Sequence, residues 1–165
     1  MAAAPRPSFI ISSADVPEEL GQYPDSDEPL GYGRRIGRAA GLIKLGLHLE
    51  RLPAGQRLSW PHAEENEDEF VYVLEGNVDA WIDGELFPMK EGDLAAFPAG
   101  TGICHTFINN SDREVKMLVG GESVAGSRIF YPLNPARRDD LPASAWWDDV
   151  PARELGPHDG KPTAR

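Results

Sequence analysis

Hydrophobic and polar side chains alternate in one segment of the chain, residues 41–52, which reads GLIKLGLHLERL. Because successive side chains of a β-strand point to opposite faces, an alternation with a period of two predicts a half-buried strand. The Pro-Ala-Gly sequence at residues 53–55 is expected to end this strand. Its apolar face would carry Ile43, Leu45, Leu47 and Leu49, and its polar face Lys44, Gly46, His48 and Glu50.

More strand-like runs follow, rich in β-branched and aromatic residues and separated by turn-forming residues. The pair Asp83-Gly84 lies between two such runs and predicts a tight hairpin. Strands at intervals of about 8 to 12 residues are typical of a β-sandwich or barrel, so we expect an all-β fold. The predicted strands lie within residues 69–76, 77–85, 86–100, 103–110, 113–121 and 127–132.

Composition agrees with many short strands in one domain. The 165 residues include 17 Gly and 15 Pro, and 41% of them are hydrophobic, as in a folded globular chain. Residues 1–35 show weak periodicity and are predicted to form an arm along the barrel or a partner subunit. Residues 36–131 would form the barrel, and residues 132–165 an irregular tail. Trp146 and Trp147 in this tail are expected to cover a hydrophobic patch or a neighbouring subunit.

The charge of the chain argues against two classes of partner. With a formal net charge of −11, binding to nucleic acid or to an anionic membrane surface is disfavoured, because both rest on Lys and Arg. No run of residues approaches the roughly 20 apolar positions of a membrane span, and the first residues lack the pattern of a signal peptide. The single Cys104 allows no internal disulfide and is expected to be a small buried hydrophobe. A cytoplasmic protein is therefore expected.

Candidate metal ligands gather in two places. His62 and Glu64 are two residues apart, so in an extended chain they point to the same face, and Glu69 opens the strand that follows. His105 begins a second short strand roughly thirty residues downstream. Two ligand-bearing strands at this separation predict a metal pocket inside a small β-barrel.

These residues resemble the two motifs of the cupin superfamily, over about residues 36–131. The first motif, G-x5-H-x-H-x3,4-E-x6-G, has two departures here, a six-residue gap before the His and Glu64 in place of the second His. The second motif, G-x5-P-x-G-x2-H-x3-N, has four residues instead of two before its His. The first motif corresponds to Gly55, His62, Glu69 and Gly76, and the second to Gly92, Pro98, Gly100, His105 and Asn109.

The resemblance implies a double-stranded β-helix, or jelly-roll barrel, with irregular extensions at both ends. It also implies a metal site formed by His62, Glu69 and His105, with Glu64 either as a fourth ligand or pointing into solvent at the rim. Imidazole and carboxylate ligands suit Fe, Mn, Ni or Zn as the divalent ion. Without a cation, the close carboxyl groups of Glu64 and Glu69 would leave one protonated and able to act as a general acid.

Two further polar residues are candidates for contact with a substrate. Asn109 follows His105 on the same strand face and either orients a ligand or forms a turn. His48 lies on the polar face of its strand and either contacts substrate or lies at the surface. His158 is expected in a flexible end.

The sequence leaves three functions open. The first is a metal-dependent oxygenase, isomerase or lyase acting on a small polar molecule. The second is a non-catalytic module that binds a sugar or a small acid, and the third is a metal-free structural protein. The apolar outer face predicted for residues 43–49 and the open strand edges favour a homodimer.

Overall fold

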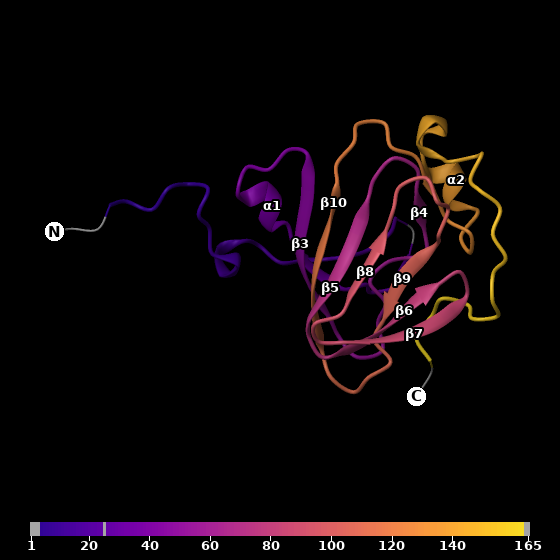
Figure 1. Cartoon of the computed structure of the whole chain (residues 1–165), viewed down its shortest axis with the longest axis horizontal. Helices are drawn as coiled ribbons and strands as arrows, with labels where there is room; N and C mark the ends of the chain where they lie inside the picture. The colour runs from indigo at the N-terminus through magenta and orange to yellow at the C-terminus, as the bar shows by residue number, and fades with distance from the viewer. Residues whose placement is uncertain (1–3, 25, 164–165) are drawn as a thin grey trace.

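The structure, a computed structural model, describes residues 4–24 and 26–163. Antiparallel strands form two sheets that face each other across the core, with irregular segments at both ends of the chain (Figure 1). The predicted all-β jelly-roll fold is confirmed. None of the helices formed by the described residues has the length and apolar character needed to cross a bilayer.

The larger sheet has six strands in the order β1-β2-β3-β10-β5-β8. The smaller one has three, in the order β7-β6-β9, and a short pair joins β11 to β4. The larger sheet consists of β1 (Glu19–Leu20), β2 (Tyr32–Arg34), β3 (Leu45–Leu52), β10 (Val115–Glu122), β5 (Glu69–Glu75) and β8 (Leu94–Phe97). The others are β4 (Ala63–Glu64), β6 (Asn77–Ile82), β7 (Glu85–Lys90), β9 (His105–Ile108) and β11 (Ile129–Phe130).

The helical elements are short and lie outside the two sheets. Helix α1 follows β2, and its Gly37 lies so close to β3 that an added Cβ would come within 3.0 Å of Leu47. The elements are α1 (Ile36–Ala39), α2 (Arg137–Asp140), and the 3₁₀ turns η1 (Ser13–Asp15) and η2 (Ala143–Ala145).

The strand predicted from the alternating leucines is confirmed, with a later start. Strand β3 begins at Leu45, so Ile43 precedes it and is 86% exposed. The predicted Asp83-Gly84 hairpin joins β6 to β7, and both residues have positive φ, 47° and 89°, as a tight hairpin turn requires. In β3, Leu45, Leu47 and Leu49 alternate with His48 and Glu50, and the latter two line cavities of the barrel.

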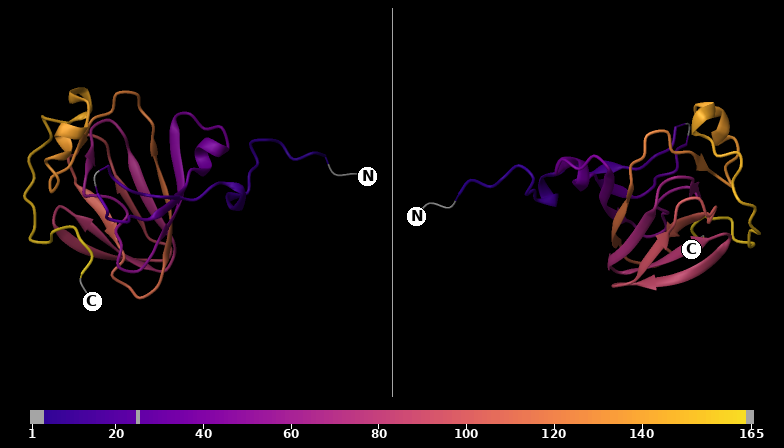
Figure 2. Two further views of the ribbon diagram at one scale, coloured as in Figure 1. Left: turned by 180° about the vertical axis from the view of Figure 1, so that it is seen from behind. Right: turned by 45° about the horizontal axis from the view of Figure 1, so that its top comes forward.

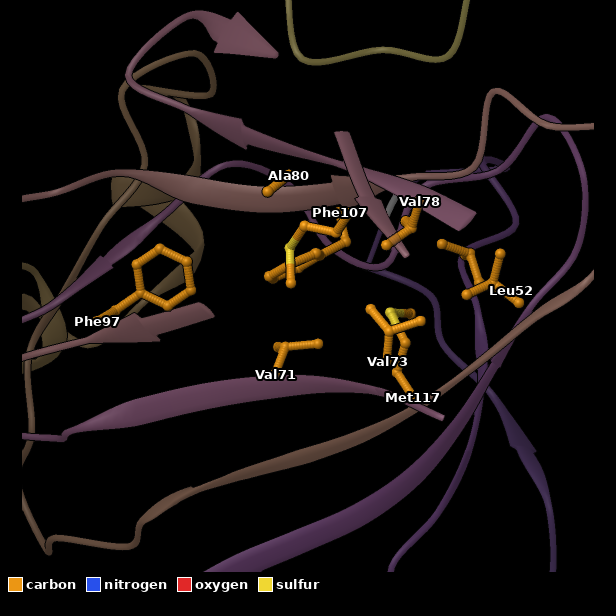
Figure 3. Packing of buried hydrophobic residues seen from close by; sticks show 10 residues of the cluster. Leu52, Val71, Val73, Val78, Ala80, Phe97, Phe107 and Met117 are labelled. Carbon is orange, nitrogen blue, oxygen red and sulfur yellow. The ribbon is translucent and has the colours of Figure 1, made fainter. Parts of the chain in front are cut away.

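The core lies between the sheets and is built from alternate positions of facing strands (Figure 3). Val71 and Val73 of β5 point toward Val78 and Ala80 of β6, and Met117 of β10 joins them. The side chains between these inward positions face outward, so inward-facing and outward-facing positions alternate along each strand. The cluster comprises Leu52, Val71, Val73, Val78, Ala80, Met89, Phe97, Phe107, Val115 and Met117, all at most 9% exposed.

The segment expected to form an arm supplies two strands of the larger sheet. Strand β2 pairs with β3, and β1 pairs with β2, so the sheet extends into residues 1–35. The part of the arm before η1 runs away from the barrel in every view (Figures 1 and 2). Its Phe9 is 70% exposed.

The C-terminal tail folds back onto the barrel. Trp146 and Trp147 are buried, at 6% and 4% exposed, and Trp147 packs in a second cluster around Trp81. The prediction that they cover a hydrophobic patch is confirmed. His158 was expected in a flexible end, and this was wrong. Its backbone N–H donates to Gly84 O at 3.0 Å, and its carbonyl accepts from the indole N–H of Trp81 at 2.9 Å.

Candidate metal centre

Three predicted ligands meet at one end of the barrel. His62, Glu69 and His105 each offer one ligand atom, and these atoms lie within 4.8 Å of one another. The Nε2 atom of His105 is 3.0 Å from Glu69 Oε2, and the Nε2 atom of His62 is 3.7 Å from the same oxygen. Two imidazole nitrogens and one carboxylate oxygen facing one point are a donor set that fits a divalent transition metal.

Backbone pairing brings the two histidines together. His62 and His105 form an antiparallel bridge, with N–H···O distances of 3.1 Å and 2.9 Å in the two directions. Glu69 is the first residue of β5, pairing with Gly121 on one side and Phe97 on the other. A direct main-chain contact thus brings together two histidines that lie far apart in the sequence.

The other ring nitrogen of each histidine is held by a backbone carbonyl. Nδ1 of His62 lies 2.7 Å from Trp60 O, and Nδ1 of His105 lies 3.3 Å from Ile103 O. With Nδ1 donating to these carbonyls, Nε2 is left as the atom that faces Glu69. Hydrogen bonds of this kind fix both the tautomer and the ring orientation of histidines that bind metals.

An aromatic stack fixes the ring of His105 further. The ring of Phe97 lies parallel to it, with centroids 3.6 Å apart and an interplanar angle of 5°. His105 is only 2% exposed. The imidazole therefore has little freedom to turn away from the cluster.

Electrostatics couple the three side chains tightly. Burial opposes ionisation of Glu69, but its hydrogen bonds to His105 and His62 outweigh burial and hold its pKa well below the usual range. Burial also opposes the charged form of His62, yet the carboxylate of Glu69 raises the pKa of that imidazole to about 9. Burial dominates at His105 and lowers its pKa. A proton on His62 thus gives the imidazole a positive charge that balances the carboxylate of Glu69. A bound metal ion would supply that positive charge instead.

Glu64 lies beside this cluster and outside the group of three. It pairs with Ile129 in the short β4–β11 sheet, and it lines the cavity in front of His62 and Glu69. Burial raises the pKa of its carboxyl to about 7. Its place at the cavity wall is compatible with a role as a further ligand or as a proton carrier.

Two cavities meet at the cluster. One of about 160 Å³ opens over β5 and β10, and another of about 210 Å³ opens toward β1 and β2. His48 lines both of them, as do His62 and Glu69. Its Nδ1 is 3.6 Å from Oε1 of Glu50, which is itself part of the second cavity wall. The structure therefore brings His48 to the cavities in which a substrate would lie.

Asn109 does not face the cluster, so the expectation that it orients a ligand was wrong. It is fully buried, and its amide donates to Leu52 O at 2.8 Å and to Arg113 O at 2.7 Å. Its Oδ1 accepts from the N–H and the hydroxyl of Ser111. Strand β9 ends at Ile108, so the side chain turns into the loop that follows. The alternative interpretation, a turn residue, describes these contacts.

Several residues that shape the site were not singled out from the sequence. Phe97 had no sequence signal beyond its place in a predicted strand. Glu122 lies at the end of a strand, and the sequence does not show which strands lie beside it. Glu67 and Asp68 belong to the acidic run before β5, which by pattern alone is typical of a solvated loop. All three acids line the cavity over the cluster.

Comparisons with known proteins agree with this geometry. The sequence signature of the family described as "Cupin domain" matches residues 48–121, which contain all three residues of the cluster. The protein named "Polyketide synthase CurC" of Streptomyces cyaneus is 30% identical over 120 residues, covering 73% of this chain and 70% of that protein. The chain belongs to the cupin superfamily.

Solved cupin structures superpose on this cupin over most of its length. A protein described as a sugar phosphate isomerase from a cupin superfamily, from Silicibacter pomeroyi, is 32% identical with a TM-score of 0.67. The match covers 74% of this chain and 80% of that protein. The polyketide cyclase RemF from Streptomyces resistomycificus has a TM-score of 0.61 at 19% identity, covering 84% of this chain and 98% of its own. This second likeness shows the fold alone.

Proposed function

We propose that this cupin is a divalent-metal-dependent enzyme that acts on a small oxygen-bearing molecule, as an isomerase, lyase or oxygenase. The observation that carries the proposal is the convergence of His62, Glu69 and His105 at a point where two cavities meet. A purely structural pocket would not need two imidazoles with both Nε2 atoms turned toward one carboxylate.

His62, Glu69 and His105 would hold the ion, which we expect to be Fe, Mn, Ni or Zn. When bound, a divalent ion there would act as a Lewis acid on an oxygen of the substrate. The carbonyls of Trp60 and Ile103 orient the two imidazoles, and Phe97 excludes water from one face of His105. This support keeps the donor atoms in place before any ligand arrives.

We assign to Glu64 the role of holding or passing a proton. Its carboxyl lines the cavity next to the cluster but is not one of the three converging ligands, so it remains available to hold or pass a proton at an oxygen atom. His48, across the same cavity and beside Glu50, is assigned to a polar contact with the substrate.

Relatives of known description support an oxygen-rich substrate. The relative at 30% identity is described as a polyketide synthase and the solved structure at 32% identity as a sugar phosphate isomerase. Both descriptions name compounds that carry carbonyl and hydroxyl groups. Chemistry of this kind proceeds through loss or gain of a proton next to a carbonyl, which a polarised oxygen and a nearby carboxyl promote.

The test is solvent exchange on metal-loaded protein. Protein reconstituted in turn with Mn, Zn, Ni and Fe is incubated in D2O with a panel of α-hydroxyketones and β-dicarbonyl compounds. Replacement of the carbon-bound hydrogen next to the carbonyl by deuterium is followed by NMR, and oxygen uptake is followed for the iron form. We expect exchange or uptake that requires metal and that falls about 100-fold in Glu64→Gln.

The metal content of the same variant separates the two roles of Glu64. If Glu64→Gln keeps its metal but loses the reaction, the residue carries a proton. If the variant loses its metal, Glu64 is a fourth ligand. Tight metal binding with neither exchange nor oxygen uptake across the panel would contradict catalysis and favour a binding module for a sugar or a small acid.

A further inference from the structure

The cavity over the metal cluster has an acidic wall. Among the described residues that line it, none is Lys or Arg, and histidines are the only basic side chains. The rest of the lining is small or apolar, from Gly46 and the β10 segment at residues 119–121. The carboxylates in the lining are Glu64, Glu67, Asp68, Glu69 and Glu122.

Backbone N–H groups fix three of these carboxylates in the wall. Glu67 Oε1 accepts from the N–H of Val124 at 2.6 Å, and Glu122 Oε2 accepts from the N–H of Asp68 at 3.2 Å. Asp68 Oδ1 accepts from the N–H of Ala99 at 2.8 Å. These hydrogen bonds hold the three carboxylate groups at the cavity, where they present negative charge.

Two arginines beside the cavities are each paired with carboxylates. Arg128 pairs with Glu65 and, at 3.0 Å, with Asp149, and it does not line the cavity. Among the described residues that line the second cavity, Arg35 is the one basic side chain besides histidine, and its Nε lies 3.3 Å from Glu19 Oε2. A phosphate group entering either cavity would therefore meet no unpaired guanidinium or ammonium among the described lining residues.

A bound divalent ion does not reverse this sign. Its two charges are offset by Glu69 and by one other carboxylate of the wall, and the remaining carboxylates leave the cavity negative. Several carboxylates around one cleft give it a negative potential, and the repulsion they exert is larger for a dianion than for a monoanion. A neutral molecule does not meet this repulsion, and a cation is attracted to the carboxylates.

We propose that this cavity selects a neutral or cationic oxygen-bearing substrate and rejects phosphate esters, with Glu67, Asp68 and Glu122 as the residues that determine this specificity. The inference rests on the proposed metal-dependent function. It separates this chain from the protein of similar sequence that is described as a sugar phosphate isomerase.

The test uses Mn(II)-loaded protein and two probes that share one α-hydroxyketone group, dihydroxyacetone and dihydroxyacetone phosphate. Paramagnetic broadening of the probe's NMR lines reports binding next to the ion. The variant is the triple substitution Glu67→Gln, Asp68→Asn and Glu122→Gln, in which each amide oxygen can still accept the backbone N–H. The matched control neutralises three exposed acids that line neither cavity, through Glu91→Gln, Asp112→Asn and Glu154→Gln.

We expect the wild-type protein to bind the neutral probe more tightly than the phosphate probe. The triple variant should bind the phosphate probe about tenfold more tightly at low ionic strength, with little change for the neutral probe and none in the control variant. Added salt should strengthen phosphate binding to the wild type, because it screens repulsion; this readout does not depend on any variant folding.

Tighter binding of the phosphate probe than of the neutral probe by the wild type would overturn the inference. An unchanged preference in the triple variant, or phosphate binding that weakens with salt, would do the same. Binding of Mn(II) itself is measured first, by loss of the EPR signal of the free ion. Failure at that step would refute the proposed metal-dependent function and this inference with it, whereas failure only at the probes refutes the specificity alone.

Discussion

The guanidinium of Arg57 and the carboxylate of Glu28 are joined by two hydrogen bonds of 2.7 Å each. Arg57 is 3% exposed, and its remaining nitrogen donates to Gly160 O in the C-terminal tail. Glu28 also accepts from the indole N–H of Trp60 at 3.0 Å, and the carbonyl of Trp60 holds Nδ1 of His62. The arm, the tail and one metal-ligand candidate thus meet at one ion pair, in which Arg57 is buried and Glu28 is half-buried.

Removing one partner of this pair should destabilise the protein. In Glu28→Ala the buried guanidinium of Arg57 loses its counter-charge, and breaking a buried ion pair in this way costs about 3 kcal/mol or more. Chemical denaturation of Glu28→Ala, beside the exposed control Glu91→Ala, measures this. A loss no larger than in the control would show that the pair does not hold the arm on the barrel.

The same pair gives a pH dependence of defined sign. Burial opposes ionisation of Glu28, but the hydrogen bonds from Arg57 and Trp60 and the charge of Arg57 together outweigh it and hold the pKa of that carboxyl below its ordinary value of 4.5. Because the folded pKa is lowered, its contribution to stability is present above about pH 4.5 and is lost as the pH falls through the folded value. In Glu28→Gln this contribution is missing, so we expect its stability to fall less between pH 5 and 3 than that of the wild type. Parallel acid-unfolding curves would contradict this assignment.

Cys104 should be chemically inert in the folded protein. Burial raises the pKa of its thiol to about 12, and the residue is 2% exposed. At pH 8 the reactive thiolate is therefore scarce and shielded. Alkylation by iodoacetamide, followed by mass spectrometry, should be at least about 100-fold slower in native protein than in urea. Equal rates would show that the segment around Cys104 opens readily.

The outer face of the larger sheet is expected to form a homodimer. Leu45, Tyr72 and Leu94 on or beside this face are 53%, 36% and 59% exposed, and burial of such apolar area drives association. Sedimentation at micromolar concentration should give a dimer for the wild type and a monomer for Leu45→Glu combined with Leu94→Glu. A monomeric wild type would contradict the expectation.

Part of the site could be predicted from the sequence, through local alternation and through the resemblance to the cupin motifs. The period of two placed β3, and the resemblance implied that His62, Glu69 and His105 converge. The one motif position that misled was Asn109, because a residue one step beyond the end of a strand no longer follows the strand's alternation.

Features that rest on distant contacts could not be predicted. The Arg57–Glu28 pair joins residues 29 apart, and the carbonyl of His158 lies 77 residues from the indole that bonds it. Such pairs leave no periodic trace in the sequence. The acidic residues before β5 are a similar case, since only the sheet shows that Glu67 and Asp68 line the same cavity as Glu122.

The most direct test of the account is the metal content of protein purified without an affinity tag, measured by elemental analysis for wild type, His105→Ala and His48→Ala. His48 lines the same cavity but is not one of the three converging ligands, so its variant is the matched control. We expect about one equivalent of a transition metal in the wild type and in His48→Ala, and its loss in His105→Ala. Absence of metal from the wild type even after reconstitution, or its retention in His105→Ala, would contradict the metal centre.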